Sequence, residues 1–356
     1  METKTKIDES KVEEFGEQLL DALNGGALSI MISIGHRTGL FDTMARMPSG
    51  TSEEIAAAAN LDERYVREWL GAMVTGRVVD VDPASGVYRL PPEHAACLTR
   101  DAAPNNIAAF AQYIPLLGCV EDGIIGCFNE GGGLPYDAFP RFHEVMAEDS
   151  GQTVLPALND HILPLAPGLK QAMAEGIEVL DIGCGSGRAV NQMSRAYPAS
   201  RFTGYDFSEE AIGVATAEAN GSGNVRFEAR DVTALGETGR FDLITAFDAI
   251  HDQVDPAAVL RGIHDALKDD GVFLMQDIHS SCDVEKNIDH PAGTLLYTIS
   301  TMHCMTVSLA GGGAGLGTMW GEETALRMLA EAGFGNVTKH RLDHDFQNTY
   351  FVARKR

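Results

Sequence analysis

The stretch Glu178-Val179-Leu180-Asp181-Ile182-Gly183-Cys184-Gly185-Ser186-Gly187-Arg188 decides the fold of this chain. A short run that ends in an acidic residue is followed by three glycines at alternate positions. This pattern predicts a buried strand that enters a tight turn and then the N-terminus of a helix. Glycine lets the backbone adopt positive φ and lets a ligand approach the main chain. The third glycine falls one place early for the dinucleotide fingerprint G-x-G-x-x-G, so a pyrophosphate is not the first interpretation.

Three more predicted strands end in acidic residues. Residues 201–206 end in Asp206, about 20 residues beyond the glycines, where a carboxylate can accept both ribose hydroxyls. Residues 225–231 end in Asp231, and residues 241–248 end in Asp248. A single acid at a strand end is often only a helix N-cap. The carboxyl ends of strands in a doubly wound sheet converge on one crevice, so the four ends together predict one ligand site.

The form Asp181-x-Gly183-x-Gly185-x-Gly187 resembles motif I of the class I S-adenosylmethionine (SAM) methyltransferases. The resemblance implies an α/β fold with a C-terminal Rossmann-like, seven-stranded methyltransferase sheet. It also implies SAM as cofactor and S-adenosylhomocysteine (SAH) as product, with the turn holding the amino-acid half of SAM. The other cofactor contacts that it implies are Asp206 and Phe207, Asp231 and Val232 at the adenine, and Phe247 and Asp248.

Composition limits the partners and the compartment. The 356 residues favour two domains, and the 44% hydrophobic content is enough for sizeable cores. A net charge of −24 argues against nucleic acid as the main partner, because phosphate contacts need a basic surface. No apolar run of membrane-spanning length and no charged-then-apolar leader is visible, so we expect a cytoplasmic protein. The six cysteines form no C-x-x-C pair, which argues against a zinc ribbon and a disulfide framework.

Residues 1–100 are predicted to form a mainly helical domain of the winged-helix type. We expect helices over residues 10–23, ending at Asn24-Gly25-Gly26, and over residues 30–47, 55–59 and 63–74, then a hairpin of residues 78–81 and 87–90. A winged helix usually binds DNA, but residues 31–100 hold seven Arg, no Lys and nine acids. Small-molecule O-methyltransferases have a similar domain, and that resemblance implies a homodimer formed through it and a cover for the substrate pocket.

Residues 101–170 are predicted to be a helical linker, and residues 171–356 the methyltransferase domain. The glycines 131–133 interrupt the linker just before an aromatic and histidine-bearing helix. Residues 131–143 are therefore open to two interpretations, a lid over the substrate or a plain connector. If they form a lid, Tyr136 and His143 are candidates for substrate contact.

A second informative pattern lies after the fourth and fifth predicted strands. His251 follows the fourth strand and Asp277 ends the fifth, so adjacent parallel strands would place them side by side. A carboxylate that holds a histidine fixes its tautomer and increases its basicity. The segment resembles the His-Asp-Trp region of the plant-type O-methyltransferases, which implies His251 as general base and Asp277 as the acid that orients it. Gln253 replaces the tryptophan of that pattern, so the adenine contact there is not expected.

The region after residue 278 has no simple pattern. In class I methyltransferases this region supplies part of the acceptor pocket, which makes His279, His303 and Trp320 candidates for substrate contact. The glycine-rich run 311–317 predicts a mobile loop. The His and Cys spacings match no standard zinc set, so we predict no metal.

The sequence therefore predicts a SAM-dependent methyltransferase that acts on a small molecule by in-line displacement, with an oxygen, sulfur or nitrogen acceptor left open. Two alternatives remain. One is a SAM-binding transcriptional regulator that reads DNA with the winged helix. The other is a metal-assisted methyltransferase of the catechol type, in which Asp248 and Asp277 bind Mg²⁺.

Overall fold

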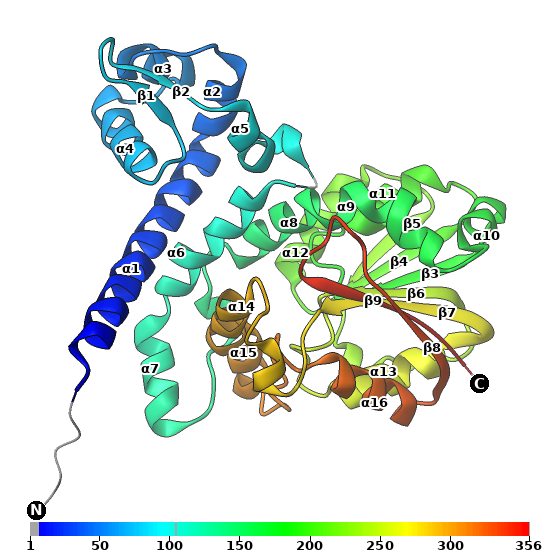
Figure 1. Ribbon diagram of the computed structural model, residues 1–356. Coiled ribbons are helices and arrows are strands. Elements are labelled where there is room, and N and C mark those ends of the chain that lie inside the picture. Colours follow the sequence, from blue (N-terminus) through cyan, green and yellow to red (C-terminus); the bar gives the residue numbers. More distant parts are fainter. Residues whose placement is uncertain (1–6, 104, 356) are drawn as a thin grey trace, which may run out of the picture. The chain divides into compact units, whose positions relative to one another are not determined.

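The computed structural model describes residues 7–103 and 105–355. The first six residues, which begin the polar stretch predicted to contain no leader, lie outside the described residues. The chain divides into two compact units, Met1–Pro115 and Leu116–Arg356 (Figure 1). The boundary falls inside the segment 101–170 that we predicted to be a linker.

Unit 1 begins with one long helix, α1 (Glu9–Thr38), which the side chain of Asp8 caps. The helix runs through Asn24-Gly25-Gly26 without a break, so the predicted stop there is wrong. Glycine inside a helix costs only about 1 kcal/mol relative to alanine, which the rest of a 30-residue helix offsets. The helix ends instead at Gly39, whose φ of +72° is the left-handed conformation common at helix ends.

The predicted helix over residues 30–47 is wrong as a single element, because Gly39 divides it into the end of α1 and a separate short helix. The other predicted helices and the hairpin are present in unit 1. A capping box of Thr51 and Glu54 opens α3 (Ser52–Ala59), and α4 (Glu63–Thr75) follows it. Strands β1 (Asp80–Asp82) and β2 (Val87–Arg89) pair antiparallel. Two short helices, α2 (Leu40–Arg46) and α5 (Pro92–Leu98), flank this group. The core that they share includes Leu40, Phe41, Ile55, Trp69 and Leu70, all buried.

Unit 2 is organised around a seven-stranded sheet with the order β5-β4-β3-β6-β7-β9-β8. The strands are β3 (Glu178–Ile182), β4 (Arg201–Asp206), β5 (Val225–Ala229), β6 (Phe241–Phe247), β7 (Leu267–Ile278), β8 (Phe334–His340) and β9 (Asn348–Lys355). The first five are parallel, and β9 pairs antiparallel with both β7 and β8. The predicted fold class is confirmed. The strand order reverses between β3 and β6, and the carboxyl ends of these strands form the crevice where such sheets bind ligands.

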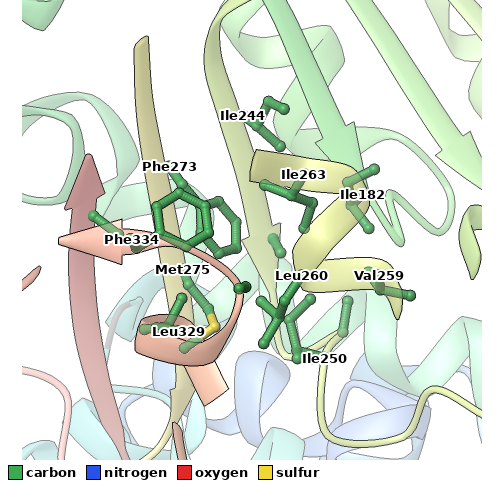
Figure 2. Packing of buried hydrophobic residues seen from close by; sticks show 14 of the residues in the cluster. Ile182, Ile244, Ile250, Val259, Leu260, Ile263, Phe273, Met275, Leu329 and Phe334 are labelled. Atoms are coloured by element: carbon green, nitrogen blue, oxygen red, sulfur yellow. The ribbon is translucent and has the colours of Figure 1, made fainter. Parts of the chain in front are cut away.

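Helices cover both faces of the sheet, so the central strands are buried on both sides (Figure 1). On one face α13 (Pro256–Ala266) and α16 (Glu322–Glu331) pack over Ile244, Phe273 and Met275, and Figure 2 shows this core. On the other face α9 (Val154–Ala157), α10 (Leu169–Glu175) and α11 (Arg188–Ala196) pack over Val179 and Leu274. Helix α12 (Glu209–Ala219) packs against β4 and β5.

The remaining helices of unit 2 precede the sheet or follow β7. The first group is α6 (Tyr113–Gly118), which begins in unit 1, with α7 (Glu121–Glu130) and α8 (Phe142–Gln152). The second group is α14 (Gly293–Ile299), a π-helical turn (Ser300–Cys304) and α15 (Met305–Ala310). The two groups meet where Leu134 N donates to Thr306 Oγ1 at 2.9 Å. A Cβ on Gly133 would overlap the backbone of Thr306, so glycine is required for this close approach.

Two observations concern the described chain as a whole. Among the described residues, no single helix is long and apolar enough to cross a membrane. One bent pair, Ile107–Gly118 with Glu121–Glu130, reaches that length and hydropathy only when the two helices are taken together. All six cysteines are free thiols.

Candidate active site

The turn after β3 depends on its three glycines. Gly183, Gly185 and Gly187 have φ values of +68°, +52° and +69°, all in the left-handed region that favours glycine. A Cβ on Gly183 would lie 2.5 Å from the Cβ of Ala249, and one on Gly187 would lie 2.6 Å from the Cβ of Ala215. A Cβ on Gly185 would meet no atom within 4 Å. Gly183 and Gly187 are thus required for packing, whereas Gly185 faces open space from which a ligand can reach the main chain.

Asp206, at the end of β4, is bonded to this turn. Its Oδ2 accepts from the backbone N–H of Gly185 at 2.8 Å, and its Oδ1 accepts from that of Ser208 at 2.9 Å. The side chain is buried. Each carboxylate oxygen can accept a second hydrogen bond, so the residue can hold the turn and still bind ligand hydroxyls.

Asp181, near the end of β3, carries a buried carboxyl group beneath the same turn. Thr245 Oγ1 donates to its Oδ1 at 2.6 Å. Burial raises the pKa of Asp181 to about 7, against the lowering effect of the Thr245 hydrogen bond. Asp181 is therefore partly protonated at neutral pH in the absence of ligand.

This raised pKa predicts a pH dependence of stability. A carboxyl whose pKa is higher in the folded state stabilises the fold below its unfolded pKa, and that contribution is lost as the pH rises through 7. We expect Asp181→Asn to remove this loss of stability at high pH, because the amide stays neutral. At about 1.4 kcal/mol per pKa unit, the stability of the variant relative to wild type should rise by up to about 4 kcal/mol between pH 4 and pH 8. Denaturant unfolding of the ligand-free proteins measures this, and parallel pH curves would contradict it.

Asp231 and Val232 have clear structural roles. The carboxylate of Asp231 accepts from Thr233 N at 2.9 Å and Thr233 Oγ1 at 2.7 Å, and these hydrogen bonds lower its pKa. The residue thus caps a short 3₁₀ turn, Val232–Ala234. Val232 is buried in the core beneath α13. The contact of these two residues with adenine stays a prediction.

Phe247 and Asp248 lie at the end of β6. Phe247 is half-buried and packs against the core beneath α11. Asp248 has a φ of +51°, and its Oδ2 accepts from Gln276 Nε2 at 2.7 Å. Its Oδ1 is buried and has no hydrogen-bond partner among the described residues. Burial, together with the nearby charge of Asp277, raises the pKa of Asp248 well above its usual range. A buried acceptor without a donor points to a ligand that supplies one.

His251 and Asp277 lie side by side, as their places after adjacent parallel strands predict. His251 Nδ1 is 2.8 Å from Asp277 Oδ1, and both side chains are almost fully buried, at 3% and 1% exposure. A carboxylate oxygen only accepts, so Nδ1 carries the proton and Nε2 is the nitrogen that can take one. Burial alone would lower the pKa of His251, but the carboxylate of Asp277 and the neighbouring Cys304 raise it well above its usual range.

Three of the predicted substrate-contact residues come together in an aromatic cluster. The cluster consists of Tyr136, Phe139, Phe142, His143 and His303. His303 stacks on Phe142 with ring centroids 3.5 Å apart and an interplanar angle of 5°. Tyr136 stacks on His143 at 4.9 Å and meets His303 edge-on at 5.2 Å.

His303 is the buried polar group of this cluster. It is 1% exposed, and neither ring nitrogen has a hydrogen-bond partner among the described residues. Burial lowers its pKa to about 3, so the ring is neutral at physiological pH. Outside the cluster, Tyr136 also contacts the exposed ring of Phe207, with ring centroids 5.0 Å apart. Through the contact with Phe207, the cluster connects the residue after β4 with the π-helical turn that carries His303.

The other two predicted contact residues lie elsewhere. His279 Nδ1 pairs with Glu322 Oε1 at 2.7 Å, at the start of α16. Trp320 is buried in the core beneath α13 and α16, and its indole N–H donates to Asp277 Oδ1 at 2.9 Å. A contact of either residue with substrate stays a prediction.

Sequence reasoning missed two polar groups beside His251. Cys304 is buried and, as the pKa of His251 indicates, its thiol neighbours that imidazole. Burial raises the pKa of Asp252 to about 6. The only signal for either residue was its position, since Asp252 follows His251 and Cys304 follows His303.

The site also contains a group of side chains with the chemistry of a cation site. Asp248, His251 and Asp277 each offer one ligand atom, and these atoms lie within 4.8 Å of one another. Carboxylate oxygens suit Mg²⁺ and Mn²⁺, and imidazole suits transition metals.

The sheet order, the glycine turn after β3 and the strand-end acid on β4 define a class I methyltransferase fold. Family models agree: residues 174–333 match the methyltransferase domain, and residues 26–100 match the Rv2258c-like winged HTH domain. The chain therefore combines an Rv2258c-like winged-helix domain with a methyltransferase domain.

Known proteins with similar sequences and structures include O-methyltransferases. The malonyl-(acyl-carrier protein) O-methyltransferase of Bacillus cereus is 30% identical over 162 residues, which are 43% of this chain and 55% of that protein. The chain spans about half the length of the first curated relatives it matches. Human N-acetylserotonin methyltransferase in complex with SAM has a TM-score of 0.69 at 18% identity, over 99% of both chains. The mitomycin 7-O-methyltransferase has a TM-score of 0.68 at 17% identity, over 98% of this chain and 100% of its own. These two structures establish the fold.

Proposed function

We propose that this chain is a SAM-dependent methyltransferase that transfers a methyl group to a small-molecule acceptor, with His251 as general base. The observation that carries the proposal is the buried pair of His251 and Asp277, which lies at the same edge of the sheet as the turn at Gly185. The acceptor atom is most consistent with oxygen, because a neutral hydroxyl needs a base; sulfur and nitrogen remain open.

The residues present fit SAM. Gly185 leaves open space beside the backbone, Asp206 can accept from ribose hydroxyls, and the unpartnered Oδ1 of Asp248 can accept from an ammonium group. Bound SAM supplies an electrophilic methyl group on a sulfonium. The further cofactor contacts that we propose are Asp181, Gly183, Gly187, Phe207, Asp231, Val232 and Phe247.

The protein contributes orientation, a base and the exclusion of water. His251 takes the acceptor proton at Nε2, while Asp277 holds Nδ1–H and stabilises the imidazolium that forms. The aromatic cluster, whose His303 is close enough to His251 to feel its charge, is proposed to keep water away from this nitrogen. Within the cluster, Tyr136, His143 and His303 are the proposed acceptor contacts, and the neutral ring of His303 can both donate and accept a hydrogen bond. His279 and Trp320 are kept as weaker candidates.

Calorimetric titration with SAM and SAH tests the proposal. Wild-type protein should bind both with saturation, and Asp206→Ala should weaken both. Label from methyl-labelled SAM should then appear in a member of a panel of phenols, thiols and amines. A folded protein that binds neither compound would contradict the proposal.

A metal-assisted reaction is the second candidate, favoured by the cluster of Asp248, His251 and Asp277. In that mechanism a cation, rather than His251, activates the acceptor. We favour the base, because Asp277 Oδ1 already accepts from His251 and from the backbone N–H of Ile278.

If His251 is the base, removal of metal ions by a chelator should have no effect on the methyl-transfer activity. Dialysis against EDTA should leave kcat and KM unchanged within about twofold, because no step requires a cation. Initial rates before and after dialysis, with and without added Mg²⁺ or Mn²⁺, measure this. A loss of activity that one of these cations restores would favour the metal mechanism instead.

We propose that unit 1 does not bind DNA. The two arginines of α4 that would face a groove are paired with acids, Arg64 with Glu68 at 2.6 Å and Arg67 with Glu63 at 3.4 Å. These pairs leave little free positive charge for phosphates. An electrophoretic mobility shift of genomic DNA fragments at physiological salt would contradict this proposal. It would favour the alternative of a SAM-binding transcriptional regulator.

A homodimer formed through unit 1 is also proposed. Helix α1 carries exposed apolar side chains three, four or seven residues apart, the spacing of a helix seam: Val12, Phe15, Leu19, Leu23, Ile30 and Ile34. Light scattering should therefore give twice the chain mass of 38.2 kDa. The six free thiols are consistent with the reducing cytoplasm, which we propose as the compartment.

A further inference from the structure

The glycine-rich loop, residues 311–321, lies against the segment that carries His251. Two hydrogen bonds join them, from Ala314 N to Val254 O at 3.0 Å and from Gly317 N to His251 O at 3.2 Å. A third comes from the end of α15, where Ser308 Oγ donates to Gln253 O at 2.8 Å. The stretch predicted to be a mobile loop is therefore bonded to the backbone of the base.

Glycines make this close approach possible on both sides of Trp320. Gly317 and Gly321 have φ values of +69° and +84°. A Cβ on Gly317 would overlap Oγ of Ser300, and one on Gly321 would overlap the backbone N of Cys282. The backbone around Trp320 is thus fixed by packing, and the indole has a defined position.

The indole of Trp320 is bonded to the acid that orients the base. Three donors converge on the single oxygen Oδ1 of Asp277: His251 Nδ1 at 2.8 Å, the backbone N–H of Ile278 at 2.8 Å, and Trp320 Nε1 at 2.9 Å. Oδ2 of the same carboxylate is buried and has no partner among the described residues. The negative charge of Asp277 is therefore shared between the imidazole and two fixed N–H groups.

We propose that Trp320 is a positioning residue, which acts through Asp277 to set the orientation and the basicity of His251. The catalytic part of this proposal rests on the proposed role of His251 as base. The indole N–H stabilises the carboxylate whether or not the imidazole is protonated. Without it, the carboxylate would attract the imidazolium more strongly and would hold the proton on His251 to higher pH.

Several ionisable groups face His251. Asp277 comes from β7, Asp248 and Asp252 from the segment after β6, and His303 and Cys304 from the π-helical turn. Among the described residues, Asp277 alone bonds to both the imidazole and the indole. A change in the indole should therefore reach the base through that one carboxylate.

The test is Trp320→Phe, which keeps the aromatic bulk and removes the N–H. We expect the acid limb of the kcat/KM profile to move up by about one pH unit, so that turnover near pH 7 falls roughly tenfold and recovers at higher pH. The Kd for SAM should change less than about twofold. A uniform loss at every pH, or no change, would overturn the proposal.

The other tryptophan provides a matched control. Trp69 is also buried and donates its indole N–H, at 2.8 Å, but to the backbone carbonyl of Met31 in unit 1. Trp69→Phe removes the same kind of hydrogen bond and should not move the pH limb. An equal shift in this variant would mean that the effect is general destabilisation, and the proposal would fail.

A readout that needs no activity separates this proposal from the proposed function. The indole N–H groups of the two tryptophans give two signals in the NMR spectrum of ¹⁵N-labelled protein, and Trp69→Phe assigns them. The Trp320 signal should titrate with pH, and His251→Gln should abolish this titration. A Trp320 signal that does not titrate in wild type, or that titrates equally in His251→Gln, would overturn the link between the indole and the base even if the protein is a methyltransferase. If the Trp320 signal titrates but the protein shows no methyl transfer, the link between indole and His251 is supported and only the proposed function is wrong.

Discussion

Replacement of His251 by alanine should lower kcat by about two to four orders of magnitude, the usual contribution of a general base. The affinity for SAM should stay within about threefold of wild type, because the ring is held by Asp277 at the strand ends and is not one of the proposed cofactor contacts. Steady-state rates and calorimetric titration on the same preparation measure the two quantities.

Two further variants make the result of this experiment specific. His251→Ala leaves the buried carboxylate of Asp277 with one donor fewer, which can cost stability. His251→Gln restores a donor and should be equally slow, since an amide is not a base. His264→Ala removes a histidine from another His–Asp pair, 3.3 Å from Asp265 Oδ1 on the outer helix α13, and should keep full activity. Normal turnover in His251→Gln would remove His251 from the mechanism.

Substitution of Gly185 by valine should raise the Kd for SAM by at least about a hundredfold. Its φ of +52° is strained for any residue with a Cβ, at a cost of roughly 1–2 kcal/mol. The new side chain would also fill the open space beside the turn in which the proposed cofactor is held. Titration with SAH measures this effect without turnover.

Gly239 provides the matched control for that substitution. It has a φ of +53°, and a Cβ there would likewise meet no atom within 4 Å. Gly239→Val introduces the same backbone strain in the loop before β6 and should bind SAM as wild type does. If Gly185→Val and Gly239→Val bind SAM equally well, the turn after β3 is not the cofactor site.

The features that the sequence predicted well depend on local patterns. The glycine turn and the acids at strand ends follow from short-range chemistry, and the doubly wound topology then brings them to one edge. The same rule placed His251 beside Asp277 across 26 residues. Asp231 shows the limit of this reasoning, since a strand-end acid can equally be a cap, and the structure shows it as one.

The features that were missed depend on contacts between distant segments. Nothing near Trp320 indicates that its indole donates to Asp277, 43 residues earlier in the chain. The glycines of that loop suggested mobility, but they are required for close packing. In α1, Gly25 and Gly26 suggested the end of a helix, but the helix continues through both residues.

The carboxylates gathered at the strand ends have a consequence for turnover. Asp206, together with Asp252 whose pKa is about 6, lies near the site where the proposed cofactor is positively charged before methyl transfer and has lost that charge afterwards. Their attraction therefore weakens in the course of each cycle. We therefore expect the demethylated cofactor to dissociate more readily than the methyl-bearing one. This difference in affinity requires no conformational change.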